Sequence, residues 1–270
     1  MPAGNARDAK CVLAVFAHPD DESLLCGGTV ARLADAGVRV VLICGSRGER
    51  GSTSDPALVA GSDLGTVRVG ELREAAAILG IDEVIALDHK DGDLRWHDVA
   101  EFHADIVSAI ERCRPEAVVT FAENGLYWHL DHIGVHERTY TAVKSFGAEA
   151  PPLYYVTMPR GVIRSVVDAA QSKREPPTQA SFWGLEPDAF GEVEMPLSFA
   201  IDVRRWVPRK MAALRCHRTQ MGRYNPIAWI DEDEARQLLG TEYFRREPRG
   251  DEAGGDLLKQ LGDRYATRDA

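Results

Sequence analysis

Short apolar runs alternate with longer segments of helical periodicity over the first 150 residues. The runs are rich in Val, Ile and Leu without strict alternation, which is typical of strands buried on both faces of a parallel sheet. They lie at residues 11–17, 38–44, 83–87 and 117–121. The helical segments lie at residues 23–36, 67–79, 99–113 and 133–146. This alternation predicts an α/β fold in which helices cover both faces of a mostly parallel sheet.

The pattern is looser after Pro151. Further strands are predicted at residues 153–157 and 199–203, and further helices at residues 204–221 and 232–239. The stretch 173–194 is rich in Pro, Glu and Gly and is expected to form a long loop, and the charged stretch 245–255 is of doubtful order. We therefore expect one domain over residues 1–270, with a core over about residues 10–160 and a C-terminal elaboration over about residues 161–270.

Composition narrows the class of protein. Of the 270 residues, 44% are hydrophobic and 27% are charged, which is enough for a sizeable core and unlike a disordered chain. The net charge of -10 argues against nucleic acid or an anionic membrane as a partner. The five cysteines form no C-x-x-C pair, and no run approaches the roughly 18–20 apolar residues that a membrane-spanning helix needs. We expect a cytoplasmic protein without disulfides; its oligomeric state is not indicated.

A first group of potential metal ligands follows the first predicted strand directly, where residues 17–22 read A-H-P-D-D-E. Ligands of open parallel sheets bind beyond the carboxyl ends of the strands, so chemistry is expected here. Pro19 constrains a turn that can aim His18 and Asp21 at one point while Asp20 lies beside them. The alternative is an ordinary solvated turn in which Asp20 or Asp21 caps the following helix.

A second group, H-L-D-H at residues 129–132, follows the fourth predicted strand after a loop. Two parallel strands of one sheet can bring both groups together. Catalytic zinc sites commonly use three protein ligands and leave a fourth position open, and His18, Asp21 and His132 supply such a set. A histidine-rich surface loop is the alternative for the second group alone, and His136, one helical turn beyond His132, is a competing ligand.

Four motifs follow one another along the chain. They are A-H-P-D-D-E at residues 17–22, G-E-R-G at residues 48–51, H-x-D-H at residues 129–132 and K-M-A-A-L-R-C-H-R-T-Q at residues 210–220. Together they resemble the LmbE-like, or PIG-L, family of N-acetylglucosaminyl deacetylases, and the likeness covers most of the chain. The resemblance implies a Rossmann-like fold, one divalent metal ion per chain, usually zinc, and removal of the acetyl group from an N-acetylglucosamine attached to another group.

The resemblance also implies the metal ligands and the base. It places the metal on His18, Asp21 and His132 and makes Asp20 the general base. In such a site zinc lowers the pKa of its water to about 7 and polarises the carbonyl, and Asp20 can accept the proton of the water. We therefore expect a metal-dependent N-deacetylase, in which either Asp20 or His129 protonates the leaving amine.

Other residues are implied to act on the substrate. His129, oriented by Asp131, is implied to stabilise or protonate the reacting centre, and Tyr127 lies where several members have a mobile tyrosine near the oxyanion. Arg68 and Asp91 resemble positions that contact sugar hydroxyls.

Two positions depart from the family pattern. Leu130 stands where the family usually has proline, and Trp128 stands where glycine is common. Neither change removes a ligand. Trp128 adds an amphipathic surface that can stack on a sugar or an aromatic aglycone, and ordinary loop packing is the alternative for it.

The substrate prediction depends on these departures. Trp128 and the loop 173–194 suit a bulky aromatic partner, and the chain resembles the antibiotic deacetylases of the family. We therefore expect a small glycoconjugate substrate, in first place a glycopeptide-antibiotic pseudoaglycone that carries N-acetylglucosamine. The alternative is N-acetylglucosaminyl-inositol or -malate, a precursor or conjugate of a thiol cofactor.

Two other classes of protein share this architecture. A nucleotide-binding enzyme would have a glycine-rich phosphate loop after the first strand, where this chain has three acids that repel phosphate. A protein that only binds a metal or a sugar would have no need of Asp20 next to a ligand.

Overall fold

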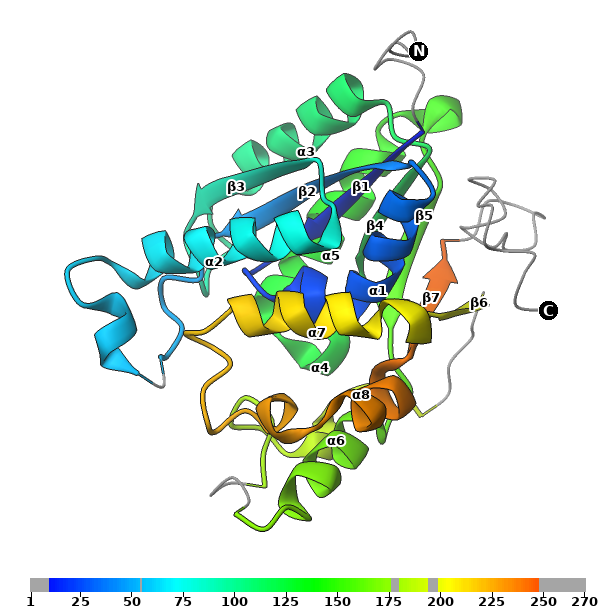
Figure 1. Cartoon of the computed structure of the whole chain (residues 1–270). Coiled ribbons are helices and arrows are strands. Elements are labelled where there is room, and N and C mark those ends of the chain that lie inside the picture. Colours follow the sequence, from blue (N-terminus) through cyan, green and yellow to red (C-terminus); the bar gives the residue numbers. More distant parts are fainter. Residues whose placement is uncertain (1–9, 54, 176–179, 194–198, 248–270) are drawn as a thin grey trace, which may run out of the picture.

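One mixed sheet contains seven strands in the order β3-β2-β1-β4-β5-β7-β6 (Figure 1). The computed structural model describes residues 10–53, 55–175, 180–193 and 199–247. Within this part the strands are β1 (Cys11–Phe16), β2 (Arg39–Ser46), β3 (Glu83–His89), β4 (Ala117–Phe121), β5 (Leu153–Thr157), β6 (Phe199–Asp202) and β7 (Thr241–Arg246). The six predicted strands are all present, and the predicted mostly parallel sheet is confirmed.

The first five strands are parallel to one another, in the order 3-2-1-4-5 of a Rossmann-like sheet. β7 runs antiparallel to both β5 and β6. The strand order reverses between β1 and β4, which pair with Val12 opposite Ala117 and Ala14 opposite Val119. A crevice for ligands is expected beyond the carboxyl ends of these two strands.

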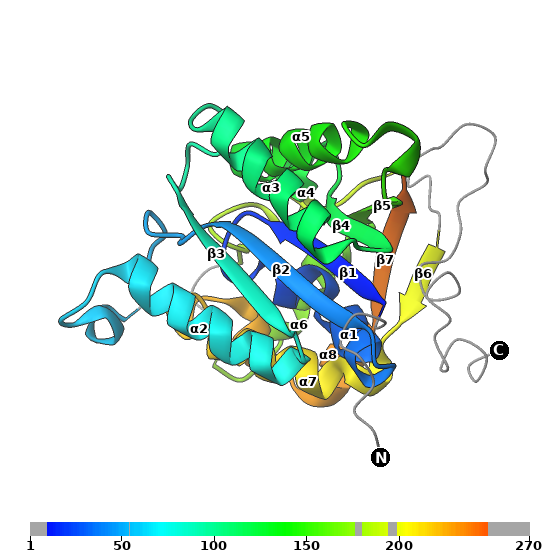
Figure 2. The ribbon, with the colours of Figure 1, turned by 90° about the horizontal axis from the view of Figure 1, so that it is seen from above.

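Helices cover both faces of the sheet (Figure 2). Their bounds are α1 (Asp21–Asp35), α2 (Leu64–Leu79), α3 (Val99–Cys113), α4 (Gly125–Trp128), α5 (Leu130–Lys144), α6 (Val162–Gln171), α7 (Val207–Cys216) and α8 (Glu232–Leu239). α3 and α5 pack together on one face, and α1, α2 and α7 pack together on the other. No helix in the described ranges is long and apolar enough to cross a membrane.

The C-terminal part differs most from the prediction. α6 and β7 were not predicted, and the helix expected at 204–221 is a 3-10 turn at Arg204–Trp206 followed by α7, which ends at Cys216. Of the expected loop 173–194, residues 176–179 and 194 lie outside the described residues. Residues 248–255 of the charged stretch also lie outside them, whereas Arg245 and Arg246 end β7.

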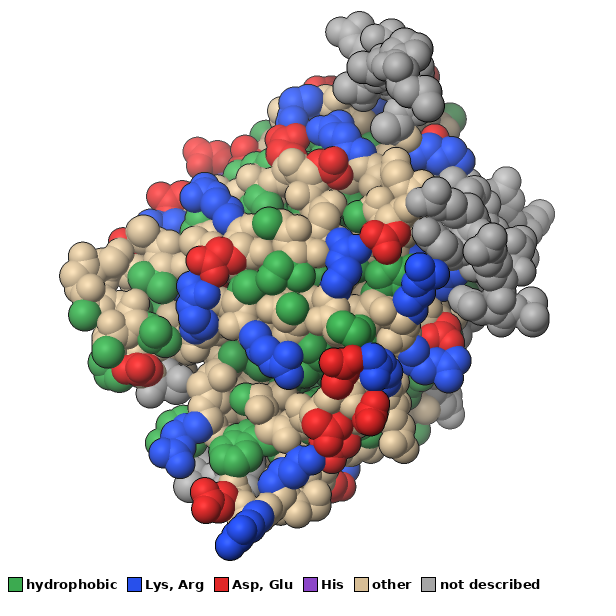
Figure 3. Space-filling view, in the orientation of Figure 1, with side chains coloured by type: hydrophobic (Ala, Val, Ile, Leu, Met, Phe, Trp, Pro, Cys, Tyr) green, Lys and Arg blue, Asp and Glu red, His purple; other side chains and the backbone are tan. Residues whose placement is uncertain are grey.

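A buried ion pair joins the C-terminal part to α1. Lys210 Nζ on α7 lies 2.7 Å from Glu242 Oε1 on β7, and both side chains are almost fully buried. The Glu242 carboxylate also accepts hydrogen bonds from the backbone amides of Gly28 and Thr29, where α1 is kinked at Cys26. The C-terminal elaboration therefore extends the sheet and holds the helix that begins at the first metal-ligand motif. The outer surface over α7 and α8 carries charges of both signs side by side (Figure 3).

Candidate active site

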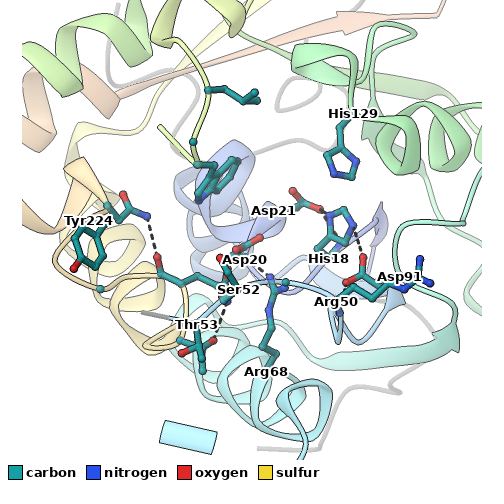
Figure 4. Close-up of a pocket in the computed structure, with 18 of the residues that line it drawn as sticks. His18, Asp20, Asp21, Arg50, Ser52, Thr53, Arg68, Asp91, His129 and Tyr224 are labelled. Carbon is teal, nitrogen blue, oxygen red and sulfur yellow. Dashed lines mark hydrogen bonds and ion pairs between the residues drawn. The ribbon is translucent and has the colours of Figure 1, made fainter. Parts of the chain in front are cut away.

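The two predicted ligand groups meet in a cavity at the carboxyl ends of β1 and β4 (Figure 4). His18, Asp20 and Asp21 follow β1 and begin α1, whereas His129 and His132 lie at the junction of α4 and α5, beyond β4. The cavity has a volume of about 780 Å³. Its remaining walls come from segments 50–53, 181–185 and 219–225.

His18, Asp21 and His132 direct their ligand atoms at a common point. His18 Nδ1 lies 3.6 Å from Asp21 Oδ2 and 3.3 Å from His132 Nε2, and His132 Nε2 lies 3.4 Å from Asp21 Oδ1. Zinc bonds of about 2.0–2.1 Å in tetrahedral geometry separate neighbouring ligand atoms by about 3.3–3.4 Å. The two imidazole nitrogens have the separation of neighbouring zinc ligands, and the Asp21 carboxylate lies beside both of them, with a different oxygen toward each. The three side chains can therefore converge on one zinc ion and leave a position for another group.

Two sets of three ligand atoms lie within 4.8 Å of one another in the described residues, and neither includes Asp21: His18 with His129 and His132, and His18 with Asp91 and Asp131. The first set shares two histidines with the proposed one. The second gathers at His18 Nε2, which already donates to a carboxylate. His136, the competing ligand, has its Nδ1 hydrogen-bonded to a backbone oxygen of β4 at 2.9 Å. These contacts argue against the second set and against His136 as a ligand, and they leave Asp21 and His129 as the candidates for the third ligand beside His18 and His132.

Hydrogen bonds orient the ring of each histidine. His132 Nδ1 donates to the Gly125 carbonyl at 3.1 Å, which leaves the Nε2 lone pair for a metal. His18 Nε2 donates to Asp131 Oδ2 at 3.1 Å and lies 3.2 Å from Asp91 Oδ1, which leaves Nδ1. Burial lowers the pKa of His132 to about 3, so the ring is neutral, as a metal ligand must be.

Asp131 contacts His129, as expected, through its backbone amide, whereas its carboxylate supports His18. Besides contacting His18, the carboxylate accepts the backbone amides of Gly92 at 2.7 Å and Leu94 at 3.0 Å. His129 is held instead by the backbone N–H of Asp131, which donates to its Nδ1 at 3.2 Å. In the neutral form of His129 the ring proton is therefore on Nε2, where it remains available to a ligand.

Asp91, expected to contact sugar hydroxyls, lines the cavity but also bonds to the protein. Its Oδ2 accepts the Arg50 amide at 2.8 Å, and its own amide donates to Glu49 Oε1 at 2.9 Å. Burial opposes ionisation of Asp91, but the hydrogen bond and charge of His18 outweigh it and lower the pKa to about 2. Asp91 is thus an ionised group on the side of His18 that faces away from the metal position.

Asp20 has the backbone geometry of a strained residue. Its φ of 124° and ψ of -23° lie in a region that side chains other than glycine rarely occupy. Its amide donates to Glu22 Oε2 at 3.1 Å, and its Oδ2 accepts from Arg68 Nη2 at 3.2 Å. Burial raises the pKa of Asp20 to about 6, against the opposing charge of Arg68. A carboxylate with a pKa near neutrality is suited to take up and return a proton.

Arg68 is held by the backbone of two motifs. Its guanidinium donates to the carbonyls of Gly48 at 2.9 Å and Pro19 at 2.7 Å as well as to Asp20. A Cβ on Gly48, whose φ is 64°, would lie 2.3 Å from Arg68 Nη1. The G-E-R-G motif therefore leaves room for a buried arginine that holds the turn carrying Asp20, a contact not foreseen from the sequence.

A buried network behind Asp20 was also missed. Glu22 Oε1 accepts from His217 Nε2 at 3.0 Å and from the Ser23 hydroxyl at 2.5 Å, while Oε2 accepts the Asp20 amide. Burial alone would lower the pKa of His217, but the charge and hydrogen bond of Glu22 outweigh burial and raise it. The only hint in the sequence was the likeness of residues 210–220 to a helix of the bacterial family members.

Comparison with known proteins decides the family. Residues 13–143 match the model of the family described as "PIG-L: GlcNAc-PI de-N-acetylase". A 1D-myo-inositol 2-acetamido-2-deoxy-alpha-D-glucopyranoside deacetylase of Thermobispora bispora is 34% identical over 268 residues, which cover 86% of each chain. The chain belongs to the PIG-L, or LmbE-like, deacetylase family.

Solved structures share the fold of this PIG-L family member. The conserved protein TT1542 from Thermus thermophilus superposes with a TM-score of 0.59 at 25% identity, over 88% of this chain and 94% of that one. The zinc-inhibited form of teicoplanin deacetylase Orf2 superposes with a TM-score of 0.55 at 20% identity, over 90% of this chain and all of that one. At 20% identity the second comparison supports the fold alone.

Residues 127–130 include the two departures from the PIG-L pattern, Trp128 and Leu130. Some residues of this segment line the cavity and others lie outside it. Tyr127 lines the cavity, with its ring centroid 5.5 Å from that of His129 and 5.3 Å from that of His132. Trp128 is 73% exposed and is not among the lining residues, and Leu130 is also exposed. Trp128 has a φ of 64°, which explains why glycine suits this position.

Proposed function

We propose that this PIG-L family member is a zinc-dependent N-deacetylase of N-acetylglucosaminyl conjugates, and that the attached group is myo-inositol. The observation that carries the proposal is the cluster in which His18 Nδ1 and His132 Nε2 lie 3.3 Å apart and each lies within 3.6 Å of an Asp21 carboxylate oxygen, with Asp20 next to Asp21 in the chain. A protein that only binds a metal would not need a second, strained carboxylate at this position. A zinc ion held by His18, Asp21 and His132 would supply Lewis acidity for water and for the amide carbonyl.

Asp20 accounts for the proton transfers and His129 for stabilisation of the oxyanion. Asp20 takes the proton of the attacking water and returns it to the leaving amine, for which a pKa of about 6 is suitable. Burial lowers the pKa of His129, so its ring is neutral at pH 7. His129 then acts through its Nε2–H as a hydrogen-bond donor to the developing oxyanion, with Tyr127 beside it.

The choice of myo-inositol is supported by the relatives. The T. bispora protein named as a deacetylase of the inositol conjugate is 34% identical, whereas the teicoplanin deacetylase is 20% identical and supports the fold alone. The expectation of a pseudoaglycone substrate depended first on Trp128, which does not line the cavity. A cavity of about 780 Å³ is in the usual range for enclosing a small ligand.

Acetate release tests this proposal. We would compare N-acetylglucosaminyl-inositol, an N-acetylglucosaminyl glycopeptide pseudoaglycone and free N-acetylglucosamine at matched zinc concentrations. We expect the inositol conjugate to be preferred, about one zinc ion per chain by elemental analysis, and loss of turnover on chelation with recovery on adding zinc. Preference for the pseudoaglycone would overturn the substrate assignment, and full activity in a metal-free preparation would overturn the mechanism.

A further inference from the structure

A tight hairpin turn forms one wall of the cavity away from the metal ligands. Phe182 and Leu185 exchange two backbone hydrogen bonds of 3.0 and 2.9 Å, so that Trp183 and Gly184 form a two-residue connection. Their φ angles are 50° and 76°. Positive φ at both central residues is the pattern of a type I′ turn, in which Asn-Gly, Asp-Gly and Gly-Gly are favoured.

Tryptophan is a poor residue for the first central position of this turn. A bulky side chain with positive φ is an outlier, and such residues are concentrated at ligand sites, where the surrounding structure holds them. Trp183 therefore does not serve the geometry of the turn, which asparagine would form with less strain. Its side chain must be explained by what it contacts.

An aromatic cluster holds the Trp183 side chain against the cavity. The indole is half-buried and lines the cavity. Its ring centroid lies 4.7 Å from that of Phe182, which is fully buried, and 6.1 Å from those of Phe190 and Tyr127. The cluster makes Trp183 a rigid surface of the wall.

The position of Trp183 relative to the reacting centre indicates what it meets. Tyr127 contacts both regions, with its ring centroid 5.3 Å from that of His132 and 6.1 Å from that of Trp183. Because Trp183 and the candidate metal ligands line the same cavity, a conjugate with its acetamido group at the ligands can reach Trp183 with the rest of its structure.

The neighbouring walls are lined by hydroxyl and amide side chains. They include Thr219, Gln220, Tyr224 and Asn225, and Figure 4 shows Tyr224 on the side of the cavity opposite His129. Thr219, Gln220 and Asn225 donate hydrogen bonds to other protein groups, whereas Tyr224 is 50% exposed. An aromatic surface in a cavity that also contains polar side chains suits a polyhydroxylated ring, which offers C–H bonds on its face and hydroxyls at its edge.

We propose that Trp183 is a specificity-determining residue that stacks on the polyhydroxylated ring attached to the N-acetylglucosamine. The inference rests on the proposed deacetylase function and deepens it: the enzyme recognises the attached ring itself, and a cyclitol or hexose is the class of group that fits. Free N-acetylglucosamine lacks this ring and gains nothing from Trp183.

Three variants separate stacking from folding. Trp183→Asn suits the type I′ turn but removes the aromatic surface, and Trp183→Phe keeps an aromatic ring. Trp96→Asn is the matched control, because Trp96 is 63% exposed and lies outside the lining of the cavity. For each variant we would measure kcat/KM for N-acetylglucosaminyl-inositol and for free N-acetylglucosamine, together with Tm.

We expect the ratio of the two kcat/KM values to fall at least tenfold in Trp183→Asn, mainly through KM for the conjugate, without a lower Tm. Trp183→Phe should keep most of the ratio, and Trp96→Asn should keep all of it. An unchanged ratio in Trp183→Asn, or an equal loss for both substrates, would overturn the inference.

Binding of the product distinguishes failure of the inference from failure of the proposed function. Calorimetric titration with glucosaminyl-inositol needs no turnover, and we expect Kd to be at least tenfold higher for Trp183→Asn than for the wild type. If the wild type released no acetate from either substrate, the proposed function would fail, and an equal Kd for both proteins would overturn the role of Trp183 independently.

Discussion

Asp131 Oδ2 lies 3.1 Å from His18 Nε2, on the side of the imidazole ring opposite the nitrogen that faces Asp21 and His132. A carboxylate in this position fixes the ring orientation and increases the basicity of the other nitrogen. The Asp131 carboxylate thus supports His18, a proposed metal ligand, while its backbone amide contacts His129.

Replacing Asp131 should weaken metal binding. We expect Asp131→Asn to lower zinc affinity about 10–100-fold, as substitutions of groups behind a metal-ligating histidine typically do. Competition with a chromophoric chelator measures the affinity, and Asp88→Asn, at an exposed carboxylate in β3, serves as the control. If Asp131→Asn instead had unchanged zinc affinity and a lower kcat, the result would indicate that Asp131 acts through His129.

Replacing Asp20 should separate metal binding from turnover. Asp20→Asn keeps the shape of the side chain but cannot accept a proton from water. We expect kcat to fall by about 10²–10⁴-fold, the usual contribution of a general base, with zinc content unchanged. Steady-state acetate release and elemental analysis of the same preparation give both quantities. A rate equal to that of the wild type would remove Asp20 from the mechanism.

The buried pair of His217 and Glu22 should make stability depend on pH. Because Glu22 raises the pKa of His217 in the folded state, the pair contributes its full stability below the unfolded pKa of about 6.5. The contribution is then lost as the pH rises through the higher, folded pKa. Removing one member of a buried ion pair costs about 3–5 kcal/mol, so His217→Gln should lower the free energy of unfolding by about that much at pH 6 and by less at pH 9.

Urea denaturation of the wild type and of His217→Gln at both pH values measures whether the loss of stability is larger at pH 6 than at pH 9. Lys210→Met, on the helix that ends just before His217, is the matched control, since it also breaks a buried pair, with Glu242, but one without a titrating histidine. Its loss of stability should be similar at pH 6 and pH 9. A loss in His217→Gln that is equal at the two pH values would contradict the assigned protonation.

Relief of backbone strain at Trp128 should stabilise the protein. Trp128 has a φ of 64° and is largely exposed, so its side chain buries little on folding. The left-handed conformation costs about 1–2 kcal/mol, and glycine recovers it at an entropic cost of about 0.5–1 kcal/mol. Trp128→Gly should therefore raise the free energy of unfolding by up to about 1 kcal/mol in urea denaturation, whereas a lower value would show that the indole makes a stabilising contact.

The sequence predicts the central sheet well because burial on both faces selects continuous apolar runs. β4 and β5 have the predicted bounds, and α3 and α8 do as well. The strand at the C-terminal side of the sheet was harder to predict. β7 reads T-E-Y-F-R-R, whose charged residues hide a strand that pairs antiparallel with both neighbours. A strand of this composition is recognisable only once its partners are known.

Which residues gather at the site could be predicted, whereas their pairing could not. His18, Asp21 and His132 meet because strand ends of a parallel sheet lie side by side, a consequence of topology alone. By contrast, the contact of His217 with Glu22 joins residues 195 positions apart. It depends on the exact end of α7, and no periodicity records which buried carboxylate a distant histidine will reach.

The three ligand atoms come from two segments of chain, and His18 and His132 are 114 positions apart. An ion bound there would cross-link the two segments, much as a disulfide does, and would close a large loop of the polypeptide. Because the ion binds the folded chain, its binding free energy would add to the stability of the fold. The melting temperature should then follow the free zinc concentration. Any cell that limits zinc would thereby control how long this polypeptide survives proteolysis as well as how fast it works.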